Sequence, residues 1–138
     1  MKKVLIGTAA IFIAMTAFDL IVHGIILSES YKATASLWRP EMQSMTWIYS
    51  VISLVGAFFF SFIFSKGYEG KGIAEGARYG LYIGIWMSIG MAYGTYAMIA
   101  IPYTMALQWF LYGVVGYVLY GIILALIFGK KTEATPAA

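Results

Sequence analysis

The sequence predicts an all-α integral membrane protein, a four-helix antiparallel bundle with both termini in the cytoplasm. The first observation is composition: 62% of the residues are hydrophobic and 11% are charged, which is not the balance of a soluble domain. The second is the division of the chain into four apolar runs, at 4–27, 45–65, 79–101 and 105–128. Each run is long enough for a membrane helix, because about 20 residues span the ~30 Å of hydrocarbon in a bilayer.

The four runs are predicted to be helices rather than strands. A segment inside hydrocarbon must satisfy its own backbone polar groups, and the alternation of a membrane strand is absent from these runs. We expect helices at about 4–27, 45–65, 73–101 and 105–128, in a single transmembrane domain of residues 1–138. Residues 28–44 are expected to connect the first two helices, and residues 130–138 to form a disordered tail.

The basic residues predict the orientation. With four spans, both termini share a side with residues 66–78, and that side carries seven basic residues: Lys2, Lys3, Lys66, Lys71, Arg78, Lys130 and Lys131. The other side carries two, Lys32 and Arg39. Because basic residues concentrate on the cytoplasmic side, we expect both termini there. In a bacterium this makes the chain a multi-pass inner-membrane protein, with residues 28–44 on the outer, periplasmic side.

Composition also excludes several kinds of site and partner. The chain has no cysteine, which removes disulfides, thiolate metal sites and iron–sulfur clusters. The net charge of +3 is spread over loop ends, and no basic aromatic surface lies outside the apolar runs. We therefore expect the lipid bilayer as a partner, and not nucleic acid.

One polar pair interrupts the first apolar run. Asp19 and His23 are four residues apart, so they share one face of a helix. A charge in hydrocarbon costs roughly 2.5–3.5 kcal/mol and usually faces a bundle interior or a wet cavity. The pair is therefore a candidate ligand or proton site that opens toward the outer side. A structural interpretation competes with it, in which the pair makes interhelical hydrogen bonds that fix helix packing. The candidate partners for such bonds are tyrosines of the later helices: Tyr93, Tyr96, Tyr112 and Tyr117.

No cofactor is predicted, and a quinone, haem and copper stay open as alternatives for this region. Haem in a membrane bundle usually needs two axial ligands, and the single histidine supplies one. Copper(I) suits imidazole and thioether groups. That chemistry selects His23 and the methionines expected near the outer surface: Met42, Met45, Met98 and Met105. Methionine also fills gaps in apolar cores, and no carboxylate pair or triad indicates catalysis, so an enzyme is not the expected class.

Small residues recur every four positions in the third helix: Gly72, Gly76, Gly80, Gly84 and Ser88. Gly90 and Gly94 add a second pair on a rotated face. Such ridges let two helix backbones approach closely, within one chain or between chains. We therefore expect a small non-enzymatic membrane protein that packs through its Gly-rich faces, as a homo-oligomer or as an accessory or assembly subunit of a larger membrane complex. The alternative is a redox or transport component that binds a quinone, a proton or a metal at Asp19 and His23.

Residues 75–84, EGARYGLYIG, and the region around His23 and Gly24 resemble the small four-helix inner-membrane proteins of bacteria whose function is unknown. The resemblance covers most of the chain. It implies a fold and a membrane location, and it transfers no activity and no functional residue.

Overall fold

The computed structural model describes residues 1–129, so the tail expected at 130–138 lies outside the described residues. Within residues 1–129 the regular secondary structure is helical, without a strand. The α-helices are α1 (Lys2–Ile21), α2 (Ser28–Ala33), α3 (Thr46–Gly67), α4 (Ile73–Met98) and α5 (Tyr103–Phe128). The all-α prediction is therefore confirmed for the described chain.

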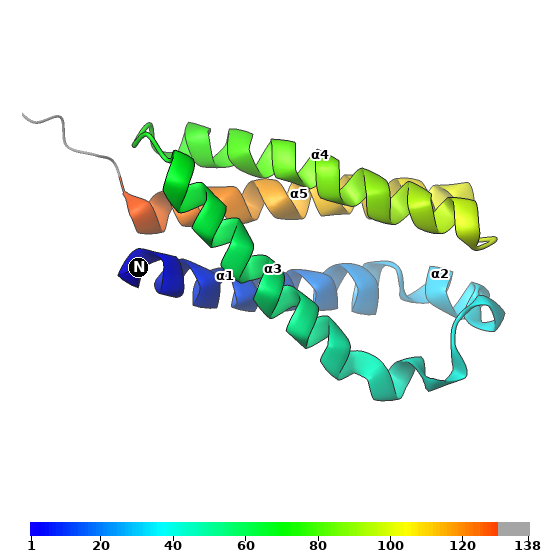
Figure 1. Cartoon of the computed structure of the whole chain (residues 1–138). Coiled ribbons are helices and arrows are strands. Elements are labelled where there is room, and N and C mark those ends of the chain that lie inside the picture. Colours follow the sequence, from blue (N-terminus) through cyan, green and yellow to red (C-terminus); the bar gives the residue numbers. More distant parts are fainter. Residues whose placement is uncertain (130–138) are drawn as a thin grey trace, which may run out of the picture.

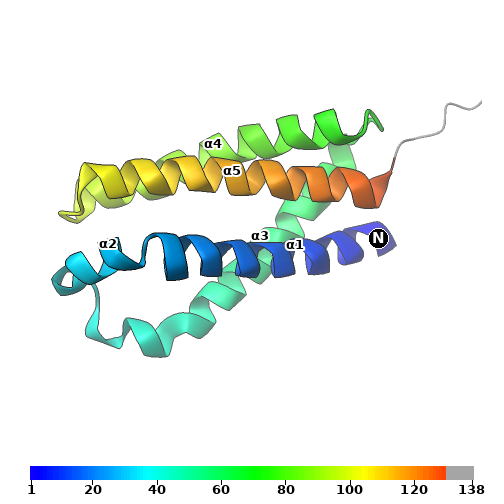
Figure 2. The same ribbon diagram turned by 180° about the vertical axis from the view of Figure 1, so that it is seen from behind.

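The long helices run roughly along one axis, except α3, which crosses the others obliquely (Figure 1). Helices α4 and α5 lie side by side and antiparallel, and α1 lies along α5 on the other side (Figure 2). Helix α3 packs on α1 near its own C-terminal end and diverges toward its N-terminal end. The N-terminus, the α3–α4 connection and the end of α5 share one end of the molecule, with α2 and the α4–α5 turn at the other.

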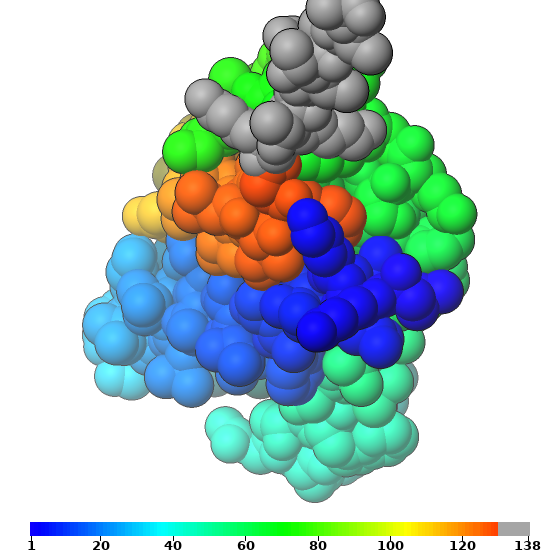
Figure 3. Space-filling view, turned by 90° about the vertical axis from the view of Figure 1, so that its left-hand side faces the viewer, coloured from blue at the N-terminus to red at the C-terminus, as the bar shows by residue number. Residues whose placement is uncertain are grey.

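Hydrogen bonds join the chain segments at the end that holds the N-terminus. The Lys3 ammonium donates to the carbonyl oxygen of Phe128 at 2.6 Å, and the Tyr68 hydroxyl donates to that of Gly129 at 2.9 Å. Figure 3 looks onto this end and shows the N-terminal residues directly beside the end of α5. The Glu75 carboxylate accepts the backbone N–H groups of Glu69 and Lys71, at 2.6 and 2.7 Å, and so holds the α3–α4 loop against the start of α4. The starts of α1 and α4, the end of α3 and the α3–α4 connection carry the basic residues Lys2, Lys3, Lys66, Lys71 and Arg78.

The α4–α5 interface is built on glycine. Gly76, Gly80 and Gly84 are buried, and a Cβ atom at Gly80 would overlap the carbonyl oxygen of Tyr117 on α5. The contact is reciprocal, because a Cβ atom at Gly121 would overlap the carbonyl oxygen of Gly76. Three glycines of the expected ridge thus pack against a helix of the same chain, which is the close approach that small residues permit.

The other glycines of the third helix have different surroundings. Gly72 precedes α4 with φ +81°, a backbone conformation that glycine adopts without steric cost. Gly90 and Gly94 lie on α4 with no other residue's atoms within 4 Å of a built Cβ, apart from the helix's own neighbouring backbone. The second small-residue pair is therefore not used for packing within the described chain.

Three helical segments are long and apolar enough to cross a membrane: Lys2–Ile26, Pro40–Gly67 and Tyr103–Phe128. Many large apolar side chains point outward on them, including Ile13 at 67% exposure and Leu126 at 62%. In water such surfaces would be costly, and in lipid they need no cover. A membrane protein is the class that this surface supports. Helix α4 is not among the three, because glycine, tyrosine and serine lower its hydropathy.

Two helix ends differ from the sequence-based expectation. The first helix does not continue as an α-helix to residue 27 but widens into a π-helical turn, Val22–Ile26, in which the Leu27 N–H donates to the carbonyl of Val22 at 2.8 Å. Helix α4 ends at Met98 rather than 101. The chain is already extended at Ile99, three residues ahead of Pro102, whereas proline restricts the residue directly before it, Ile101.

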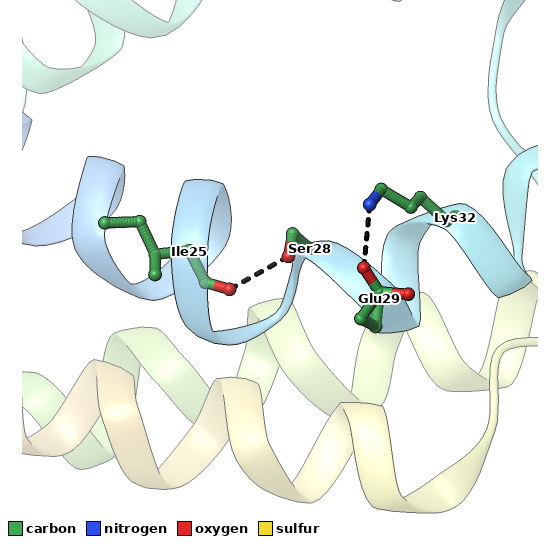
Figure 4. A network of polar contacts seen from close by, with 4 residues as sticks. All are labelled: Ile25, Ser28, Glu29 and Lys32. Carbon is green, nitrogen blue, oxygen red and sulfur yellow. Dashed lines mark hydrogen bonds and ion pairs between the residues drawn. The ribbon is translucent and has the colours of Figure 1, made fainter.

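The connection of residues 28–44, which is expected on the outer side and is named the outer connection, is a series of short helical turns. Helix α2 is followed by 3₁₀ turns at Ala35–Leu37 and Pro40–Met45. Figure 4 shows the entry into α2, where the Ser28 hydroxyl donates to the carbonyl of Ile25 at 2.9 Å. The Lys32 ammonium pairs with Glu29 at 2.7 Å on the same helix. Both side chains of this ion pair are exposed, so the pair contributes little to stability.

Candidate functional site

A cavity of about 310 Å³ lies where α3 diverges from α4 and α5. Its lining residues come from the end of the first helix and from α3, α4 and α5: Met15, Phe18, Asp19, Val22, His23, Ile52, Ser53, Gly56, Met87, Ser88, Met91, Trp109, Tyr112, Gly113, Gly116, Tyr117 and Tyr120. Both residues of the predicted polar site are among them. The volume falls at the lower end of the range for small-molecule sites.

Asp19 brings a carboxylate to this cavity without a partner of opposite charge. It lies in the last turn of α1, and its side chain remains accessible. Within residues 1–129 the Asp19 carboxylate makes no hydrogen bond or ion pair, and the lining of the cavity contains no lysine or arginine. An intramembrane charge normally pairs with another group. The unpaired state of Asp19 is therefore an unusual feature of the described chain.

His23 lies in the π-helical turn, and its hydrogen-bond partner is Tyr31 of α2. The His23 Nδ1 atom and the Tyr31 hydroxyl oxygen are 2.7 Å apart. Burial raises the pKa of the Tyr31 hydroxyl, so that group remains protonated and can donate to a neutral imidazole. The Nδ1–H of a charged imidazole can donate to the phenol oxygen instead. This bond ties the helix end to α2, and single π turns often occur at functional sites.

No hydrogen bond links Asp19 to His23 in the described chain. The two side chains line one cavity, as their spacing suggested, but His23 is oriented by Tyr31 rather than by Asp19. Of the tyrosines considered as partners, Tyr112 and Tyr117 line the cavity. Tyr93 and Tyr96 lie farther along α4 and pack against Tyr103, with ring centroids 6.2 and 5.9 Å apart.

An aromatic cluster joins His23 and Trp109, which line the cavity, to Tyr31 and Trp38 of the outer connection. Trp109 of α5 stacks on Tyr31 with ring centroids 6.2 Å apart, and it also contacts Trp38 at 6.0 Å and His23 at 6.3 Å. The indole N–H of Trp38 donates to the Thr34 hydroxyl at 3.0 Å. The indole N–H of Trp109 is buried and, within residues 1–129, meets no acceptor with hydrogen-bond geometry. Burial raises the pKa of the nearby Tyr31 hydroxyl, and the partial positive charge of this N–H group acts on that hydroxyl and lowers its pKa by less.

The methionines of the copper hypothesis are dispersed. Met105 is buried in the core beside Trp109, whereas Met98 is 85% exposed at the end of α4. Met42 and Met45 belong to the outer connection. None of the four lines the cavity, whose methionines are instead Met15, Met87 and Met91. In the described part of the chain no three His, Cys, Asp or Glu residues gather as a metal-binding group.

Several site residues had no signal in the sequence. Tyr31 lies eight residues after His23, which is beyond the three- or four-residue spacing of helical neighbours. Trp109 is 6% exposed in the core, and its residue type alone does not place it beside His23. Ser53 and Gly56 of α3 line the cavity because α3 diverges there. The position of Ser53 and Gly56 beside the cavity follows from the oblique course of α3, which the sequence does not indicate.

Comparison of the chain with protein-family models, with curated proteins and with solved structures gives no match.

Proposed function

We propose that this chain is an inner-membrane protein that binds a small amphipathic molecule in the cavity beside Asp19 and His23, as a binding or transport component rather than an enzyme. The observation that supports it is the cavity itself. It joins apolar and aromatic walls to a few polar groups, namely Asp19, His23, Ser53 and Ser88. Apolar walls with a small number of oriented polar groups are typical of small-molecule sites.

The proposal includes four spans with both termini in the cytoplasm. Helix α4 has 26 residues, as does α5, and both are about 39 Å long at 1.5 Å per residue. The glycine contacts hold α4 against α5 from Gly76 to Ser88. A helix fixed in this way to a spanning helix of equal length spans with it, although its own hydropathy is lower. Residues 28–44 would then lie on the periplasmic side.

An accessory or assembly subunit is the second candidate function, and one observation favours it. Gly90 and Gly94 of α4 face open space, so a helix of another protein or of a second copy could approach closely there. The glycines Gly76, Gly80 and Gly84 do not support this candidate, because α5 of the same chain already covers them.

Orientation can be tested with reporters. A cytoplasm-active reporter fused after Ala138 is expected to be active, and a periplasm-active reporter inserted at Ser36 is expected to be active as well. The reason is the bias of seven basic residues against two between the two sides. Periplasmic signals at both Ser36 and Ala138 would mean an odd number of spans and would remove α4 as the fourth, whereas a cytoplasmic signal at Ser36 with a periplasmic signal after Ala138 would mean the reverse orientation.

Ligand binding can be tested by filling the cavity. Gly56 lines it, and a Cβ atom there would meet nothing within 4 Å, so Gly56→Leu adds bulk to the cavity without a clash at the backbone. The purified protein in lipid nanodiscs is expected to bind a short-chain benzoquinone in a saturable manner. Gly56→Leu is expected to weaken that binding by about tenfold, or 1.4 kcal/mol.

The matched control is Gly90→Leu, the same change at a position that is outside the cavity and also has free space. It should bind the benzoquinone like the wild type. Equal saturable binding by all three proteins would contradict the proposed function, and so would the absence of saturable binding for both the benzoquinone and a small organic cation.

A further inference from the structure

The geometry points to a ligand class for this cavity: a monovalent organic cation with apolar groups around the charge, held by Asp19 and by aromatic ring faces. The inference rests on the proposed function and narrows it. Its first basis is charge. Asp19 is the carboxylate of the cavity, it has no ionic partner within residues 1–129, and the lining contains no lysine or arginine.

The second basis is the chemistry of the walls. Trp109, Tyr112, Tyr117 and Tyr120 all line the cavity from one side of α5. The faces of tryptophan and tyrosine rings carry partial negative charge and attract cations, and quaternary ammonium groups are often bound by them. A carboxylate at one wall and aromatic rings at another provide two kinds of group that attract a single positive charge. An anion would meet repulsion from both.

Metal cations are a poor match for the same walls. A hydrated metal ion entering the cavity must exchange water for oxygen or nitrogen ligands. Within the described chain no three His, Cys, Asp or Glu residues come together for that purpose. An organic cation carries its apolar groups with it, and these groups gain from burial among Met15, Met87 and Phe18. The cavity volume of about 310 Å³ suits a compact cation rather than a large dye.

His23 supplies the remaining polar contact. Its Nδ1 atom is engaged with the Tyr31 hydroxyl at 2.7 Å, which leaves Nε2 for a ligand or water. Of the ionisable side chains that face Asp19 across the cavity, His23 comes from the first helix and Tyr112, Tyr117 and Tyr120 come from α5. His23 is the group among them that could become positive and compete with a cationic ligand. The tyrosines can only remain neutral or become negative.

The test compares two probes of nearly the same shape, benzyltrimethylammonium and neopentylbenzene, which differ by a quaternary nitrogen in place of carbon. Both are measured on the wild-type protein in lipid nanodiscs at neutral pH. We expect saturable binding of the ammonium probe that is at least tenfold tighter than that of the neutral probe. The attraction between opposite unit charges a few ångströms apart exceeds that factor even at an effective dielectric constant of about 20, which leaves a margin for the lost hydration of the cation.

Variants of Asp19 identify the source of the preference. Asp19→Asn keeps the shape and removes the charge, and it should reduce the ammonium affinity by about tenfold or more while leaving the neutral probe unchanged. Asp19→Glu keeps the charge and should retain most of the preference. The comparison of the two probes on the wild-type protein needs no variant, so it remains decisive if a variant fails to fold.

The outcomes distinguish the cation inference from the proposed binding function on which it rests. Equal affinity for the two probes, or an ammonium affinity that Asp19→Asn leaves intact, overturns the cation assignment. If the short-chain benzoquinone still binds and Gly56→Leu weakens it, the binding function survives without the cation. If neither the ammonium probe nor the benzoquinone binds, both proposals fail.

Discussion

Gly80→Ala is expected to destabilise the folded protein strongly, although the change adds one methyl group and favours helix. A Cβ atom at Gly80 would overlap the carbonyl oxygen of Tyr117, and it would lie 2.7 Å from the carbonyl carbon of Tyr117 and 2.8 Å from Cα of Val118. These are backbone atoms, so no side-chain rotation relieves the clash. Helices α4 and α5 must move apart. The cost should be about 3 kcal/mol, at the upper end of the range for overpacking, against a gain of at most about 1 kcal/mol in helix propensity.

The matched control is Gly90→Ala on the same helix. Nothing lies within 4 Å of a Cβ atom there, so the propensity gain of up to about 1 kcal/mol should appear alone. The measurement is thermal unfolding in detergent, followed by circular dichroism. A lower melting temperature for Gly80→Ala and an equal or higher one for Gly90→Ala are expected. If Gly80→Ala melted at or above the wild-type temperature, the close approach of α4 to α5 would be wrong.

The Gly-rich ridge shows which part of a packing prediction can be made from the sequence and which part cannot. A spacing of four residues predicts a smooth helix face and close approach, and Gly76, Gly80 and Gly84 make such contacts. The partner could not be read in the same way. The contact surface on α5 includes Gly121, but it also includes the backbone of Tyr117 and Val118, and the residue types at 117 and 118 do not reveal that their backbone is approached.

The polar site shows a similar division. Asp19 and His23 could be found from composition, because a carboxylate and an imidazole in an apolar run are costly and stand out. The cavity could not be found, since it depends on the angle at which α3 leaves the bundle. The bond from His23 to Tyr31 also depends on a π-helical turn, and no residue pattern in that segment indicates one.

The number of membrane spans depends on α4, whose composition and whose contacts with α5 indicate different answers. Hydropathy identifies three segments, and α4 falls below them because the glycines and tyrosines that suit it for packing against α5 are less apolar than leucine or isoleucine. The residues that allow α4 to pack closely against α5 thus lower the hydropathy by which a membrane-spanning helix is recognised. This is why the sequence-based expectation of four spans needs the reporter experiment.

The second substitution with a large expected effect on stability lies in the aromatic cluster of Trp109, Tyr31, Trp38 and His23. Trp109 is 6% exposed and contacts Tyr31, Trp38 and His23. Two of these partners, Tyr31 and Trp38, belong to the outer connection, so Trp109 is one of the α5 residues that hold this connection against the helix. Its indole N–H meets no acceptor with full hydrogen-bond geometry within residues 1–129, and its remaining polar interaction is with the Tyr31 hydroxyl. The ring should therefore stabilise the fold mainly by packing, and the N–H group should contribute little.

Two substitutions of Trp109 are therefore expected to change stability by different amounts. Trp109→Ala removes the packing and should cost about 3–5 kcal/mol, with faster hydrogen exchange of the backbone amides in residues 28–38 as the connection loosens. Trp109→Phe keeps much of the ring and removes the N–H group, so its stability should stay within about 1.5 kcal/mol of the wild type. Trp47, which is 64% exposed on α3, provides the control, and Trp47→Ala should leave exchange in residues 28–38 unchanged. If Trp109→Ala left that exchange unchanged as well, the connection would be held to the bundle by something other than this ring.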